Sequence, residues 1–344
     1  MVENKQYQLP IPVINRKESE SLDLLADRYN KLTQPNRIVR IGEKAKDLIP
    51  DGVINFGSGM AENISSFEIY QRAMEIASDG FKVLEEQLAV FTISEQKIIH
   101  DINSVSEGNE ITDLSEICLV RSYDICKLVQ TSKGKERIAA IVEGGVTGVG
   151  GLWGIPFNLA LSTLLYFRAV QLIALYYGYD VKNDSAELII ASEVFTSSLS
   201  PAKNSVNNEL NGVISKVMLM TQSTVVKQTA KKTWTDMATR GGVPLLLTQM
   251  RALANKAAQR ALENAGAKGL EQSVFKETFE QIGRKLTLKT VQKAVPFVSA
   301  ALSALIDTAQ MDRVLKFADI FYQKRFILEK ESRIAALINA DVVG

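Results

Sequence analysis

The sequence Gly144-Gly-Val-Thr-Gly-Val-Gly-Gly-Leu-Trp-Gly-Ile-Pro-Phe-Asn158, followed by the mostly apolar run 159–179, decides how this chain folds. Between Glu143 and Asp180 the only charged residue is Arg168. A stretch this poor in charge is typical either of the buried centre of a helical domain or of a segment that contacts a lipid bilayer. Both interpretations require helices here.

The spacing of small residues predicts how these helices pack. Pairs such as Gly150 and Gly154 have the small-xxx-small spacing that lets two helices approach closely. Pro156 suits the first turn of a helix, and Gly178 suits its end. We therefore predict a glycine-rich apolar helical hairpin over 144–179. Its packing or membrane-contacting residues are Gly144, Gly145, Gly148, Gly151, Trp153, Gly154 and Pro156.

The rest of the chain also has helical periodicity. Asp113 and Glu116 form a capping-box pattern that predicts a helix to about Gln130, and further helices are expected over 185–198, 296–329 and 332–339. We find no convincing run of period-two alternation. The predicted fold is all-α, a multi-helix bundle. Its parts are an N-terminal arm with a short helix (1–36), a main helical domain (37–330) and a C-terminal tail helix (331–344).

Composition excludes several function classes. The net charge is +1, which offers no general attraction for nucleic acid. His100 is the only histidine, so histidine metal sites and Ser-His or Cys-His dyads are excluded or nearly so, and no metal or cofactor is expected. Cys118 and Cys126 lie eight positions apart on one helix face, roughly 12 Å along the axis, too far for a disulfide. The N-terminus lacks a signal-peptide pattern, so we expect a cytoplasmic location.

Arg168 is the most informative single residue, because an unpaired guanidinium inside an apolar helix is very costly. Either it pairs with Glu143, Asp180 or Asp307 and orders a core, or it holds an anion such as a lipid phosphate. Asn158, near the start of the same helix, is either a capping or hydrogen-bonding residue or part of that anion site. An enzyme would need Glu143, Asp180, Asp307 and Arg168 to converge beside the glycine segment.

Two groups of residues resemble the signatures of a known family. The first runs from Gly144 through Pro156 and Arg168 to Tyr177-Gly-Tyr-Asp180, and the second is Lys293-Ala-Val-Pro296, Asp307 and 317–326. In order and separation they resemble the EcsC family. The resemblance implies a bacterial helical protein near the cytoplasmic side of a membrane, because the namesake is encoded beside an ABC transporter. Asn158 stands where this family often has an acidic residue.

These observations favour a non-enzymatic, membrane-associated protein. It would contact or insert into the inner face of the bilayer through 144–179, as a transporter accessory or a membrane-perturbing effector. The expected partner is the lipid surface or an integral membrane protein such as an ABC transporter, and an oligomer is compatible with the sequence. The alternatives are a hydrolase with carboxylate-centred chemistry and an interaction scaffold. The scaffold would present apolar residues of a long C-terminal helix to a partner, namely Leu315, Ala318, Ile320, Phe321 and Phe326.

Overall fold

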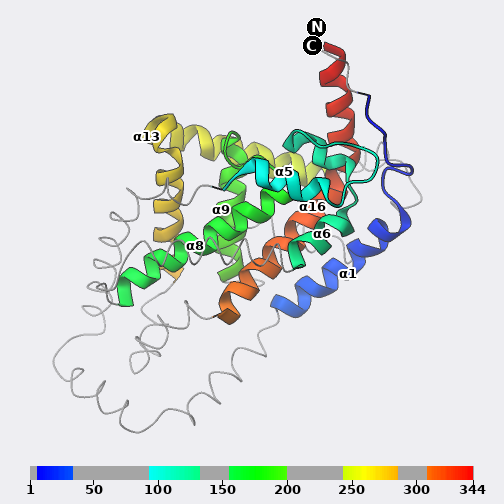
Figure 1. Cartoon of the computed structure of the whole chain (residues 1–344). Helices are drawn as coiled ribbons and strands as arrows, with labels where there is room; N and C mark the ends of the chain where they lie inside the picture. Colours follow the sequence, from blue (N-terminus) through cyan, green and yellow to red (C-terminus); the bar gives the residue numbers. More distant parts are fainter. Residues whose placement is uncertain (1–5, 34–92, 132–154, 200–242, 286–307, 344) are drawn as a thin grey trace, which may run out of the picture.

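The computed structural model describes residues 6–33, 93–131, 155–199, 243–285 and 308–343, and every regular element in these ranges is a helix. The predicted all-α class is confirmed. In chain order the elements are α1 (Arg16–Thr33), α5 (Glu95–Asn103), the 3-10 helix η3 (Leu114–Leu119), α6 (Ser122–Gln130), α8 (Ile155–Tyr176), α9 (Ser185–Leu199), α13 (Val243–Lys285) and α16 (Thr308–Val343) (Figure 1).

Helix α8 lies at the centre of the described bundle. From Thr163 to Tyr177 every side chain is buried, because α9 and α16 pack along the helix and α5, α6 and α13 also contact it. A helix that is apolar on all sides is stable in water only when protein covers all of its faces. The described half of the uncharged run is therefore a core helix.

The C-terminus of α8 is closed by a Schellman motif at Gly178. The Gly178 N–H donates to the carbonyl of Leu175 at 2.8 Å, and the Tyr179 N–H donates to that of Ala174 at 3.0 Å. Gly178 has φ +73°, a left-handed conformation that glycine adopts at little cost. The predicted helix stop at Gly178 is confirmed.

The predicted capping box at Asp113 and Glu116 is present, but the helix that it opens is short. A 3-10 helix ends at Leu119, and α6 begins only at Ser122, with Arg121 extended between them. The break has a physical cause in Glu18 of α1. Its carboxylate accepts the Ser122 N–H at 2.9 Å and the Arg121 guanidinium at 3.1 Å, so the chain turns here to meet α1.

The prediction of separate helices over 296–329 and 332–339 was wrong at their junction, because α16 continues through it. Lys330 lies there, fully buried, and its ammonium bonds Glu18 at 2.7 Å and the carbonyl of Val120 at 2.9 Å. Packing of α1 along α16 therefore holds the helix intact at this point. The glycine-rich residues 144–154 lie outside the described ranges, so the hairpin and the domain boundaries stay predictions.

Candidate functional site

The loop that leaves α8 carries Tyr177-Gly178-Tyr179-Asp180, and its first side chain is tied to α16. The Tyr177 hydroxyl donates to the buried Asp319 carboxylate at 2.8 Å. Burial raises the pKa of Asp319, and burial together with Asp319 raises the pKa of Tyr177 well above its ordinary value. The Cys126 thiol faces the same carboxylate. Burial is the main cause, and the negative charge of Asp319 the second, that raises the pKa of the Cys126 thiol to about 12. Such a thiol is a poor nucleophile at neutral pH, and both cysteines are free, as predicted.

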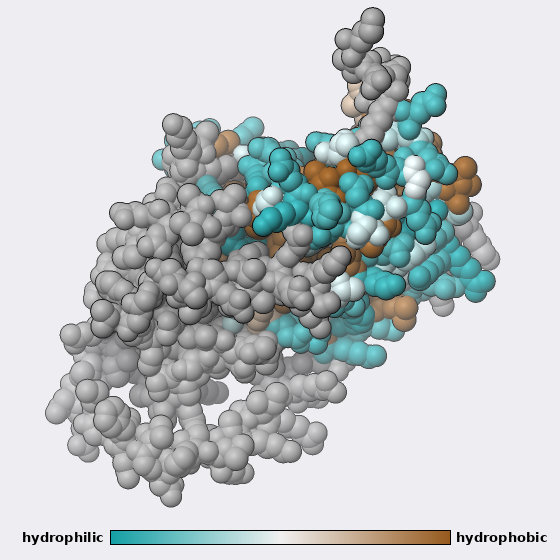
Figure 2. Space-filling view, in the orientation of Figure 1, coloured by the Kyte–Doolittle hydropathy of each residue, from teal (hydrophilic) through white to brown (hydrophobic). Residues whose placement is uncertain are grey.

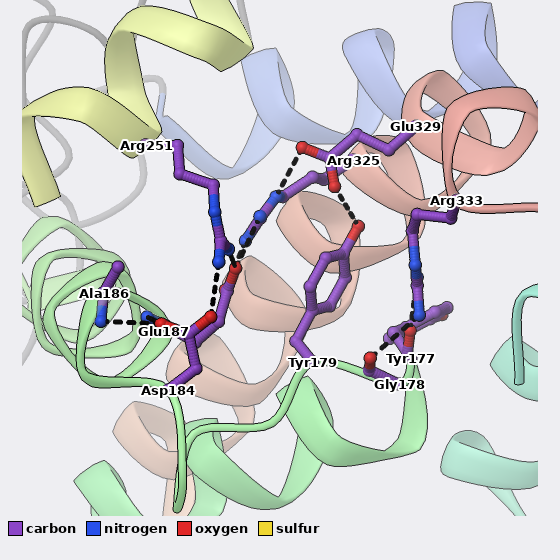
Figure 3. A network of polar contacts seen from close by, with 10 residues as sticks. All are labelled: Tyr177, Gly178, Tyr179, Asp184, Ala186, Glu187, Arg251, Arg325, Glu329 and Arg333. Atoms are coloured by element: carbon purple, nitrogen blue, oxygen red, sulfur yellow. Dashed lines mark hydrogen bonds and ion pairs between the residues drawn. The ribbon is translucent and has the colours of Figure 1, made fainter. Parts of the chain in front are cut away.

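The second tyrosine of the loop, Tyr179, lies between two guanidinium groups of α16 (Figure 3). The Cζ atoms of Arg325 and Arg333 are 4.0 and 4.6 Å from its ring centroid, and its hydroxyl donates to Glu329 at 2.9 Å. Arg333 also donates to the carbonyls of Tyr177 and Gly178 at 2.9 and 2.8 Å. A cation at this position satisfies the end of α8 and complements its dipole.

Beneath this loop, Glu187 of α9 is the centre of a buried ionic network. Arg325 forms two bonds to its carboxylate, at 2.6 and 2.8 Å, and a third to Glu329 at 3.1 Å. Arg251 of α13 binds both Glu187 and Asp184. Burial alone would lower the pKa of Arg325, but Glu187 and then Glu329 outweigh it, so the guanidinium stays charged. The network joins α9, α13 and α16.

A cavity of about 1220 Å³ opens beside the network. Its walls come from α5, η3, the loop after α8, α9, α13 and α16, and they carry seven carboxylates and three guanidinium groups. A concave space with polar groups on its walls is a candidate binding site. Within the described ranges, no group of three or more His, Cys, Asp or Glu side chains is arranged to hold a metal ion.

Arg168 finds a carboxylate that the sequence did not suggest. Its guanidinium bonds Glu271 of α13, and it also donates to Gln171 at 2.9 Å. Glu271 lies 103 positions further along the chain, so local spacing could not have indicated it. Arg168 is buried about two turns before the end of α8, roughly 12 Å from that end along the helix axis, and it does not line the cavity.

The other candidate residues are distributed as follows. Asp180 lines the cavity, where its carboxylate accepts the N–H groups of Lys182 and Asn183 at 3.0 and 2.9 Å. It therefore lies apart from Arg168, and the two do not form one centre. Pro156 and Asn158 lie in the first turn of α8. The side chain of Asn158 lies outside the described part of the chain, as do Glu143, the glycines 144–154, Trp153 and Asp307.

The network unites the two stretches whose sequences resembled a family signature, 177–180 and 317–326. A model of the EcsC protein family matches residues 38–327 of the chain. The chain belongs to the EcsC family. The EcsC region includes Tyr177, Glu187, Arg251 and Arg325, whereas α1 and the last part of α16 lie beyond it. No curated protein and no solved structure matches the chain significantly.

Most of this network could not be predicted from the sequence. Glu187 lies in the first turn of the helix predicted over 185–198, and its partners Arg251 and Arg325 lie 64 and 138 positions away. One signal was present, because Arg325 lies within the second stretch of family resemblance. Its pairing with Glu187 explains why a buried guanidinium is tolerated in that stretch.

Proposed function

We propose that this EcsC-family protein is a non-enzymatic protein that associates with the cytoplasmic face of a membrane. The segment 144–157, with Trp153 among its glycines, makes the contact. The partner is the lipid surface. Support comes from the low charge of this segment and from the basic stretch 133–137 beside it, which suits an anionic leaflet. The family's namesake is encoded beside an ABC transporter, which agrees with a location near membranes.

The observation that carries this proposal is the burial of α8 from Thr163 to Tyr177. Protein covers this half of the uncharged run, and Glu271 neutralises its one charge. Within the uncharged run this burial leaves only residues before Thr163 for a bilayer, and we assign the contact to 144–157 and expect it to be shallow and peripheral. Among the described helices, none combines the length and the apolar character needed to cross a bilayer.

The surface of the described bundle offers little else for lipid. Hydrophilic side chains predominate among the coloured atoms on the face shown in Figure 2, with apolar ones in smaller groups. Among the described residues, the large exposed apolar side chains are Leu9, Ile11, Leu24 and Ile338. The scaffold alternative loses its expected surface, because Ala318, Ile320, Phe321 and Phe326 are buried in the core and Leu315 is partly buried against it.

Co-sedimentation with lipid vesicles tests the proposal. We expect the protein to pellet with vesicles rich in phosphatidylglycerol and less with phosphatidylcholine alone. Trp153→Asp should weaken binding about tenfold or more, since burial of a large apolar side chain contributes roughly 1.5–3 kcal/mol. Leu24→Asp is the matched control, because Leu24 is 62% exposed on α1, and it should bind as the wild type does.

Two outcomes would contradict lipid contact. The first is a protein that stays in the supernatant with every vesicle composition. The second is Trp153→Asp and Leu24→Asp proteins that bind equally well. Binding to native membranes that disappears after protease treatment of those membranes would instead assign the contact to an integral membrane protein.

A further inference from the structure

The N-terminal arm, residues 6–15, lies on the surface of the bundle and forms no helix. It runs beside the last turns of α16 (Figure 1). None of its residues is fully buried, whereas α1, which follows it, contributes Leu22 and Leu25 to the core. A segment that buries so little can open while the rest of the domain stays folded.

Side chains of the bundle bind the main chain of this arm. The Asn109 amide accepts the Gln8 N–H at 2.8 Å and donates to the Gln8 carbonyl at 2.8 Å. Arg121 donates to the carbonyls of Pro12 and Val13 at 2.9 and 3.2 Å. Such contacts bind a peptide through groups that every residue has, as proteins that recognise peptide segments do.

Two side chains of the arm reach inward. Tyr7 and Val13 pack against a small apolar cluster, which is formed by Cys118, Leu119, Ile334 and Leu337. The Tyr7 hydroxyl also donates to the Glu116 carboxylate at 3.2 Å. Between them, Leu9 and Ile11 are 39% and 89% exposed. The arm is therefore held by its side chains at positions 7 and 13 and by its main chain at positions 8 and 12, and positions 9 and 11 are free to vary.

We propose that the surface under the arm is a peptide-binding site that the arm occupies in cis. This arm site consists of the apolar cluster with Asn109, Glu116 and Arg121. Its ligand is a non-helical segment of another protein that has an aromatic residue and, six positions later, a small aliphatic residue. The tethered arm competes at a millimolar effective concentration, so a partner must bind tightly enough to displace it. The site does not depend on lipid contact by 144–157, so either proposal can fail without the other.

The tether of the arm argues against a second copy of the chain as the ligand. Asn15 donates to the Tyr123 hydroxyl at 3.3 Å, and α1 begins at Arg16, only three positions after Val13. The arm of another copy would bring its own α1 to the place where α1 already packs on α6 and α16. A segment that does not lead into a helix avoids this clash.

Fluorescence anisotropy with a labelled, amidated peptide of residues 6–13 tests the site in the full-length protein. The Tyr7→Ala/Val13→Ala protein should bind the peptide with a Kd below about 1 mM. The wild type should bind it at least about tenfold more weakly, because its own arm competes. Asn109→Ala, added to the double variant, should raise the Kd about fivefold or more, since it removes two hydrogen bonds to the peptide.

Matched control peptides distinguish the arm site from general hydrophobic adsorption. The Leu9→Ser/Ile11→Ser peptide should bind the double variant as the parent peptide does, because these side chains face water. The Tyr7→Ser/Val13→Ser peptide also loses two apolar side chains, but it should bind at least about tenfold more weakly, because these two are buried on binding.

The inference is overturned if the double variant does not bind the parent peptide at about 1 mM, or if the two serine peptides bind equally well. It is also overturned if the double variant loses cooperative urea unfolding, because the arm would then be part of the core. A stable complex of the double variant with wild-type protein in size-exclusion chromatography would contradict the clash and make a second copy the ligand.

Discussion

The ion pair between Glu18 and Lys330 should contribute far more to stability than an exposed pair on the same helix. Both side chains are fully buried, and the ammonium lies 2.7 Å from the carboxylate. Breaking a buried pair on one side costs about 3–5 kcal/mol, because the other charge stays buried without its partner. We expect Lys330→Met near the lower end of this range, since Glu18 keeps Arg121 at 3.1 Å, and Glu18→Leu near the upper end.

A double-mutant cycle measured by urea unfolding at pH 7 tests this reasoning. The Glu18→Leu/Lys330→Met protein should lose at least about 2 kcal/mol less than the sum of the single variants, because the second substitution removes a stranded charge. The control cycle uses Asp312 and Lys316, one turn apart on α16 with side chains 58% and 55% exposed. Its coupling should be about 0.5 kcal/mol or less. Equal couplings in the two cycles would refute the argument.

The same pair predicts an acid dependence. Burial alone would raise the pKa of Glu18, but Lys330 and the surrounding N–H groups outweigh burial, and the pKa falls below its ordinary value of 4.5. The unfolded chain therefore binds the proton more readily than the folded protein. The stabilisation is complete above about pH 4.5 and declines as the pH falls through the folded value. The Glu18→Leu protein should lack this part of the pH profile.

Three further predictions concern other parts of the bundle. Gly178→Ala should cost at least about 2 kcal/mol more than Gly108→Ala in urea unfolding. Both have positive φ, but a Cβ on Gly178 would lie 2.6 Å from a backbone oxygen, whereas at Gly108 it meets a flexible side-chain end. Burial lowers the pKa of Lys324 to about 7, so stability should rise between pH 7 and the ordinary value of 10.5, where the unfolded chain binds the extra proton. The Lys324→Met protein should show a smaller increase in the free energy of unfolding over this pH range. An increase equal to that of the wild type would contradict the prediction. Glu271→Ala should lower the stability of the protein more than Arg168→Met does, because it leaves the buried Arg168 guanidinium without its carboxylate. In Arg168→Met, the 39% exposed Glu271 side chain can be solvated by water. A larger fall in Tm for Arg168→Met than for Glu271→Ala would contradict this.

Local features of the fold could be predicted from the sequence, whereas the network could not. Gly178 and the Asp113–Glu116 capping box act within one turn of their own positions, so a few residues reveal them. Helical periodicity also shows which segments are apolar enough to be buried. It does not show which distant residue will form an ion pair with a buried charged side chain. In the sequence, Glu271 and Arg251 look like the other charged residues of the partly exposed helix α13. The break before α6 was missed for the same reason, since its cause, Glu18, lies 104 positions earlier.

The pairing of α1 with α16 also fixes the order of events during synthesis. Glu18 and Lys330 are 312 positions apart. At roughly 5–20 residues per second, a ribosome needs about 15–60 s to travel between them. During that time the apolar face of α1, with Leu22, Leu25 and Tyr29, lacks α16, the described helix that packs most extensively against it. We therefore expect this apolar face to be accessible to a chaperone until α16 emerges.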